Sequence, residues 1–106
     1  MKLSTHQLLN LISLTILIIG ILANFLVITE NGGRMPVYTE KYSWKSNSHF
    51  TYTNESEVAY HFLTDQYKLH GSKIYSLGDI LMTLGFFAVT IGNITLMIRL
   101  LKREEW

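Results

Sequence analysis

The sequence contains no cysteine, which excludes disulfide bridges, thiolate metal sites, iron–sulfur clusters and a lipoprotein anchor. Proline occurs once, and only 16% of the 106 residues are charged, whereas 48% are hydrophobic. A chain with so few charges and so much apolar content is unlike an ordinary soluble domain. The formal net charge is only +1, and the basic residues are scattered along the chain, so no nucleic-acid partner is predicted.

The hydrophobic residues are concentrated in two long runs. The first, residues 8–29, contains no charged residue. At about 1.5 Å per helical residue it spans roughly 33 Å, enough to cross a hydrocarbon core of about 30 Å. Ser4 and Gln7 predict a capping box at its start, and the Asn-Gly-Gly sequence at 31–33 is typical of a helix end. A cleaved secretory signal is the alternative, although the run is longer than a signal core and no A-x-A site follows it.

The second run begins at Ser76, which predicts another capping box with Asp79, and continues to Leu101. We therefore predict an all-α membrane protein, a two-transmembrane-helix hairpin with a polar loop. The predicted segments are an N-terminal tail at 1–7, transmembrane helices at 8–29 and 76–101, an extramembrane loop at 30–75 and a C-terminal tail at 102–106.

The loop is rich in Tyr, Ser, Thr, Asn and charged residues, and two elements are predicted in it. Aromatic residues alternate with polar ones on either side of residues 45–49, which favours a small β-hairpin. After Asn54, apolar residues recur at near-helical spacing, which favours a short amphipathic helix at about 55–69. The residues of this apolar stripe are Val58, Ala59, Phe62, Leu63, Tyr67 and Leu69.

Basic residues near the ends of the two runs are equally numerous in the tails and in the loop. They are Lys2, Arg99, Lys102 and Arg103 on the tail side, and Arg34, Lys41, Lys68 and Lys73 on the loop side. The tail charges are packed into very short segments, and the amino terminus adds another. We therefore favour a multi-pass protein of the cell membrane with both termini in the cytoplasm.

Each predicted membrane helix has one face of small and polar residues. In the second helix this face contains Gly78, Gly85 and Gly92, with Asn93 on the neighbouring stripe. In the first helix it contains Asn10, Ser13, Gly20 and Asn24. Seven residues make two helical turns, so the three glycines share one side and we expect the two faces to pack together. Because amides in hydrocarbon need partners, Asn24 and Asn93 are candidates for hydrogen bonds between the helices.

Three polar residues near the loop ends of the helices, Asn31, Arg34 and Asp79, form a candidate ligand, ion or partner site. A helix hairpin would bring them together. Two simpler interpretations remain open. Asp79 can cap its own helix, where a carboxylate satisfies free amides and the helix dipole. Arg34 can instead pair with Asp79.

The sequence predicts neither an enzyme nor a cofactor. It contains no recognisable nucleophile–base pair, nucleotide-binding loop or zinc motif. His61 and Asp65 are four residues apart, as two metal ligands on one helix face would be, but no third ligand is specified. We therefore interpret them as polar residues on a wet surface, and we expect no bound metal.

Several motifs resemble an uncharacterised family of small bacterial membrane proteins found chiefly in Firmicutes. The resemblance covers about residues 20–95 and is most specific in the N-G-G-R-M-P-V run at 31–37 and the S-x-G-D-x-L run at 76–81. Further matching residues are Asn24, His49, Thr53, Phe62, Leu63, Asp65, Leu69, Gly85 and Phe86. The family has no assigned activity. Its members are longer, with additional membrane helices before this region, so the resemblance implies that this chain corresponds to their C-terminal half.

The leading functional hypothesis is a noncatalytic accessory or structural subunit of a bacterial membrane complex. It would pack through its glycine and polar helix faces and dock through its aromatic-rich loop. Its partners would be the lipid bilayer and either other membrane subunits or a second copy of the chain. Two alternatives remain open, namely ligand or ion binding at the outer helix ends, and an immunity-type protein that protects a producing cell from a membrane-active peptide.

Overall fold

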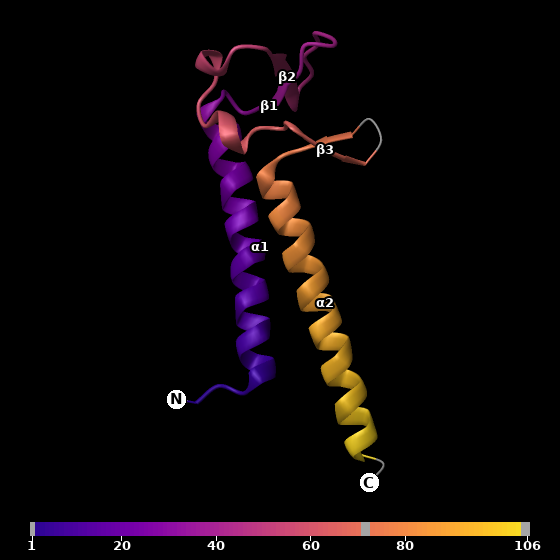
Figure 1. The fold of residues 1–106 in the computed structure, drawn as a ribbon. Coiled ribbons are helices and arrows are strands. Elements are labelled where there is room, and N and C mark those ends of the chain that lie inside the picture. Colours follow the sequence, from indigo (N-terminus) through magenta and orange to yellow (C-terminus); the bar gives the residue numbers. More distant parts are fainter. Residues whose placement is uncertain (1, 71–72, 105–106) are drawn as a thin grey trace.

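Two long helices run side by side and carry a small polar head at one end (Figure 1). A computed structural model describes residues 2–70 and 73–104 of the chain. The helices are α1 (Thr5–Glu30) and α2 (Leu77–Glu104). Between them come β1 (Met35–Tyr38), β2 (His49–Tyr52), the 3-10 turns η1 (Glu55–Glu57) and η2 (His61–Leu63), β3 (Tyr67–His70) and β4 (Lys73–Tyr75). We call residues 31–70 and 73–75 the head.

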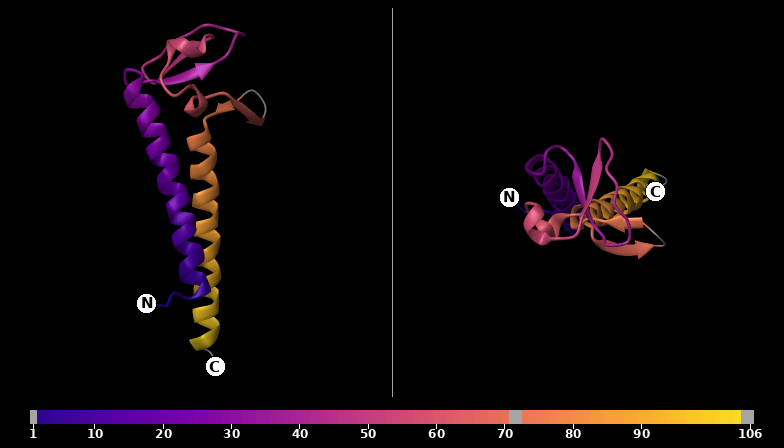
Figure 2. Two further views of the ribbon diagram at one scale, coloured as in Figure 1. Left: turned by 60° about the vertical axis from the view of Figure 1, so that its left-hand side comes forward. Right: turned by 90° about the horizontal axis from the view of Figure 1, so that it is seen from above.

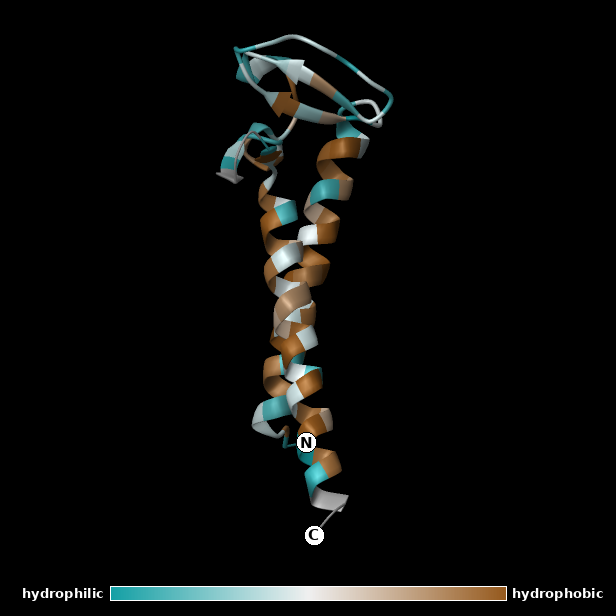
Figure 3. Ribbon diagram, turned by 90° about the vertical axis from the view of Figure 1, so that its right-hand side faces the viewer, coloured by the Kyte–Doolittle hydropathy of each residue, from teal (hydrophilic) through white to brown (hydrophobic). Residues whose placement is uncertain are grey.

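Both helices are long and apolar enough to cross a membrane, and the predicted spans at 8–29 and 76–101 lie almost entirely within them. Many of their apolar side chains are exposed, and the hydropathy colouring shows apolar residues along most of their length (Figure 3). The capping box of α1 is present, with Ser4 and Gln7 bonded reciprocally, so the helix includes three polar residues before the apolar run. Residues 105 and 106 of the predicted C-terminal tail lie outside the described residues.

The head rests on a small apolar core at the end of α1. Val27 is fully buried there, and Met35 and Leu63 pack on it from the head. Gly32 and Gly33 have φ angles of 77° and 85°, and the Gly33 N–H donates to the Ile28 carbonyl at 2.9 Å. The predicted Asn-Gly-Gly helix end is thus confirmed, because only glycine adopts consecutive positive φ angles without strain.

Two small sheets form the head (Figure 2). β1 and β2 pair in parallel, from Met35 opposite His49 to Tyr38 opposite Tyr52, and Asp65 bridges the other edge of β1. β3 and β4 pair in antiparallel fashion. The predicted hairpin around residues 45–49 is present only as a local turn with one antiparallel bridge, between Lys45 and Phe50. The longer pairing of β2 is with β1, which the sequence did not indicate.

The predicted amphipathic helix at about 55–69 is wrong. That stretch contains η1, η2 and most of β3. Tyr60 has a φ of 56°, in the left-handed region, so no helix can continue through it. The neighbouring Ala59 has its N–H and its carbonyl bonded to the Asn31 side chain. Tertiary hydrogen bonds therefore take the backbone groups that a helix would have used, and the periodic apolar pattern does not decide the structure.

Candidate functional site

A closed hydrogen-bond network joins the two helices where they meet the head. The Asn24 amide donates to Asp79 Oδ1 at 2.8 Å, and its oxygen accepts from Ser76 Oγ at 2.6 Å. The capping box of α2 completes the network, because the Asp79 N–H donates to Ser76 Oγ at 3.0 Å and the Ser76 N–H donates to Asp79 Oδ2 at 3.2 Å. Ser76 is fully buried. We call these three residues the polar clamp.

Below the polar clamp the helices touch through glycines. A Cβ built on Gly20 would lie 2.7 Å from the Gly78 carbonyl oxygen, and one on Gly78 would lie 2.7 Å from the Gly20 carbonyl oxygen. Two turns further along α2, a Cβ on Gly85 would lie 2.7 Å from the backbone nitrogen of Leu17. Real Cβ atoms do not come this close to backbone, so a side chain at any of these positions would separate the helices.

Toward the chain ends the helices no longer touch closely, and they diverge in the view of Figure 1. A Cβ on Gly92 would meet nothing within 4 Å. A groove of about 570 Å³ lies here, and we call it the lower groove. Its lining includes Asn10, Ser13, Gly92 and Asn93, together with His6, which contacts Arg99.

Three polar residues of the lower groove, Asn10, Ser13 and Asn93, make no hydrogen bond to one another in the structure. Ser13 donates to the Leu9 carbonyl within its own helix at 2.9 Å. Asn10 Oδ1 is buried and has no partner among the described residues. Asn93 is exposed, and the structure gives it no hydrogen bond to α1 within the described range. Of the two asparagines expected to bond between helices, Asn24 does so and Asn93 does not.

The three residues of the candidate site at the helix ends have separate partners. Asn31 donates to the carbonyl oxygens of Val27 and Ala59 at 2.7 and 3.0 Å and accepts from the Ala59 N–H at 2.9 Å. The Arg34 guanidinium lies 5.5 Å from the centre of the Phe50 ring. Asp79 belongs to the polar clamp. Within the described residues no ion pair joins Arg34 to Asp79, and the hairpin does not bring these side chains into one site.

The hydrogen bonds of Asn31 are expected to attach the backbone at Ala59 to the end of α1. Asn31→Ala removes both bonds to Ala59, and the unpaired backbone groups should lower the free energy of unfolding of the head by about 2 kcal/mol. Hydrogen exchange of the Ala59 amide measures this directly. Asn47→Ala, at an exposed position of the same loop, is the control and should leave Ala59 exchange unchanged.

A buried carboxyl group lies inside the head. Asp65 is 6% exposed, and its backbone is fixed on β1, since its N–H donates to the Pro36 carbonyl and its own carbonyl accepts from the Tyr38 N–H. Asp65 Oδ2 lies 3.5 Å from His49 Nε2. Oδ1 has no partner among the described residues. Burial, with a smaller contribution from the negative charge of Asp79, raises the pKa of Asp65 from 3.8 to about 7.

Next to this carboxyl group, a ring of hydrogen bonds is complete. The Tyr52 hydroxyl lies 2.6 Å from His61 Nδ1 and 2.5 Å from Thr64 Oγ1, and Thr64 donates to the His61 carbonyl at 2.7 Å. One consistent assignment has His61 donate to Tyr52 and Tyr52 donate to Thr64. Burial raises the pKa of Tyr52, so its phenol keeps its proton. This ring is structural, whereas Asp65 has unused hydrogen-bonding capacity.

The polar clamp, the glycine contacts and Asp65 all lie within one stretch of the chain that matches a known family. The model of a protein family matches residues 4–91. The chain belongs to DUF5317, a family of unknown function. No curated protein and no solved structure matches the chain significantly. Membership of DUF5317 therefore relates the fold described here to a family without adding an activity.

In this DUF5317 chain, the structure places His61 and Asp65 differently from the interpretation of the sequence. They do not lie on one helix face, and Asp65 is not on a wet surface. Leu63 fills the apolar core and draws the following residues inward, so Asp65 is buried with them. No periodicity marks this position. The resemblance includes Asp65 among its matching residues, but it does not predict that Asp65 is buried.

The DUF5317 head offers proton chemistry at Asp65. Among the described residues no group of three or more His, Asp or Glu side chains is placed to hold a metal ion. Ser48 Oγ lies 2.8 Å from His49 Nδ1, and His49 Nε2 faces Asp65. Such an arrangement can pass a proton between the surface and a buried carboxyl group.

Proposed function

We propose that this DUF5317 chain is a membrane-embedded, noncatalytic accessory subunit of a bacterial membrane complex, and that one transmembrane helix of a larger subunit packs into the lower groove. The observation that carries the proposal is the buried Asn10 oxygen, which has no hydrogen-bond partner among the described residues, in a groove between two largely apolar helices. An unsatisfied amide in hydrocarbon costs free energy, and a polar residue on an incoming helix would remove that cost.

The outward faces of the helices support a bilayer as their surroundings. Phe25 is 67% exposed and Leu101 is 63% exposed, and similar apolar side chains cover both helices. A continuous apolar surface of this size is unfavourable in water. We place both chain termini in the cytoplasm and the head outside. The exposed aromatic residues of the head, including Trp44 and Phe62, would then lie near the headgroups or contact the larger subunit.

A helix is the occupant that the lower groove fits best, because the groove continues the α1–α2 interface. Above it, Gly85 lets the backbones approach closely, and Gly92 lies two turns further on the same face with open space beside it. The missing side chain at Gly92 would let a third helix approach as closely as α1 approaches Gly85. A site formed by Asn31, Arg34 and Asp79 is less well supported, since each of these side chains already has a partner.

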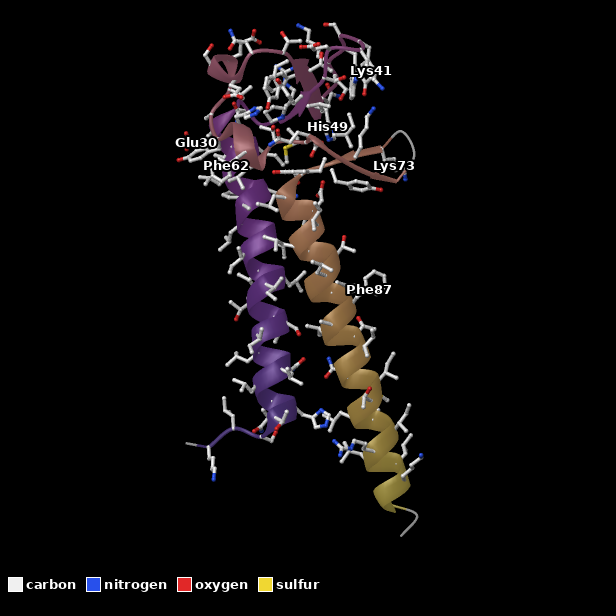
Figure 4. The ribbon with its side chains drawn as sticks, in the orientation of Figure 1. Glu30, Lys41, His49, Phe62, Lys73 and Phe87 are labelled. Carbon is white, nitrogen blue, oxygen red and sulfur yellow. The ribbon has the colours of Figure 1, made fainter. Side chains whose placement is uncertain are left out.

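The test is the native mass and composition of the complex extracted from the source membrane in mild detergent. We expect a larger assembly with a defined second component. Gly92→Leu should reduce the recovered partner about tenfold by filling the groove. Phe87→Leu is the control, because Phe87 points away from α1 (Figure 4) and its replacement should leave the partner bound. A bare monomer of the unaltered chain, or a Gly92→Leu variant that keeps its partner, would contradict the proposal.

A further inference from the structure

The proposed docking does not use Asp65. The side chain is 9% exposed, one oxygen has no partner among the described residues, and the other lies 3.5 Å from His49 Nε2. That distance is too long for a strong charge-assisted hydrogen bond. A buried carboxylate normally has several donors, so the surroundings of Asp65 suit a neutral acid better than an anion.

His49 connects this acid to water. Its side chain is 39% exposed, and Figure 4 shows it within the head, near the start of α2. One ring nitrogen faces Ser48 Oγ at 2.8 Å, and the other faces Asp65. An imidazole with one nitrogen toward the surface and one toward a buried acid can accept a proton on one side and release it on the other.

The other ionisable groups around Asp65 do not stabilise its anion. Asp79, on α2, contributes a negative charge that opposes ionisation. Tyr38 and Tyr52 come from the two strands, and His61 comes from η2 and is bonded to Tyr52. Arg34, just before β1, lies over the Phe50 ring. Within 4.0 Å of Asp65, His49 is the only basic group among the described residues.

The backbone of Asp65 links the head to the helices. Its N–H donates to the Pro36 carbonyl, and its carbonyl accepts from the Tyr38 N–H. β1 in turn packs on the end of α1 through Met35. The preceding Leu63 belongs to the same core. Any change that draws water toward the Asp65 carboxyl group must therefore disturb the contact between the head and the helix ends.

We propose that Asp65 and His49 form a proton-binding site through which the pH of the compartment facing the head controls how tightly the head packs on the helix ends. The ligand is one proton, taken up from water through His49. With the proton bound, Asp65 is neutral and the head is closed. With the proton lost, a carboxylate lies near Asp79, and the contacts of Asp65 with β1 loosen.

The direction of the pH effect follows from the pKa. The folded chain holds the pKa of Asp65 at about 7, above its ordinary value of 3.8. A raised carboxyl pKa means that the folded state binds the proton more tightly than the unfolded state. The stabilisation is therefore complete below the ordinary value and is lost as the pH rises through about 7. Between mildly acidic and neutral pH, the head should therefore loosen as the pH rises.

The test follows amide exchange at Tyr38, whose N–H donates to the Asp65 carbonyl, in the full chain in lipid nanodiscs. After correction for intrinsic exchange, protection should fall about tenfold between about pH 5.5 and about pH 8.5. Asp65→Asn should abolish the step, because the amide does not titrate. Glu57→Gln, an exposed acid in the same head, is the matched control and should keep it.

A second measurement does not depend on the folding of any variant. The carboxyl carbon of Asp65 can be titrated by NMR in the unaltered chain, and its midpoint should lie near 7. His49→Gln should slow the proton exchange of this carboxyl group while the fold persists. The proposal is wrong if the carboxyl group titrates near its ordinary value, if Tyr38 exchange is flat over this range, or if Asp65→Asn keeps the step.

Discussion

Replacing Gly78 with alanine is expected to open the helix hairpin. The added methyl group would collide with the Asn24 side chain and would lie 2.7 Å from the Gly20 carbonyl oxygen. Backbone cannot move aside as a flexible side chain can, so the helices must separate and the polar clamp must lengthen. We expect a loss of about 3 kcal/mol in the free energy of unfolding, measured by reversible denaturation in mixed micelles.

Gly92→Ala is the matched control, because it makes the same change on the same face of α2. Among the described residues, no atom outside the neighbouring residues and backbone of α2 lies within 4 Å of the added methyl group. Alanine also has the higher helix propensity, so the free energy of unfolding of the isolated chain should change by less than about 1 kcal/mol. Equal losses from the two substitutions would mean that the helices do not approach closely at Gly78.

The second large effect is expected at Asn24. Asn24→Leu removes the donor to Asp79 Oδ1 and the acceptor for Ser76 Oγ in one step. Ser76 then loses this partner in a buried position, and the Asp79 side chain loses it in a half-buried one. The free energy of unfolding should fall by about 3 kcal/mol, in the same denaturation experiment.

Asn10→Leu tests the opposite case, four turns away on the same helix. The Asn10 oxygen has no partner among the described residues, so its removal breaks no hydrogen bond of that oxygen and replaces a polar group with an apolar one. The isolated chain should be unaffected or slightly more stable. If Asn10→Leu destabilised the chain as much as Asn24→Leu, the distinction between the polar clamp and the lower groove would fail.

The helices, their starts and the end of α1 could be predicted from the sequence because the signals are local, whereas α2 continues to Glu104 through part of the predicted C-terminal tail. The two capping boxes involve residues three positions apart, and the glycine turn at 32 and 33 follows α1 directly. The helix faces were also predictable in part. A seven-residue glycine repeat shows which side of α2 meets α1, but it does not show where along that side the helices separate. That depends on the crossing of the helices, so Gly85 and Gly92 look equivalent in sequence and differ in the structure.

The head could not be predicted in the same way. β1 and β2 pair in parallel, across a connection whose length and composition do not specify a register. The apolar pattern at 55–69 has a helical period, yet Asn31 bonds to Ala59 and Leu63 fills the core. Both contacts join residues far apart in the chain. The burial of Asp65 follows from these long-range contacts, and no local pattern carries them.

The polar clamp also has a consequence for the order of folding. Its Asn24–Asp79 bond joins residues 55 positions apart, and closing so long a loop costs conformational entropy. The pairing of β1 with β2 joins residues that are closer in sequence, such as Met35 and His49. A folded head would hold the end of α1 near the start of α2. We therefore expect the head to fold first, which shortens the effective loop between the helices. The helices should then associate last, with a smaller loss of conformational entropy.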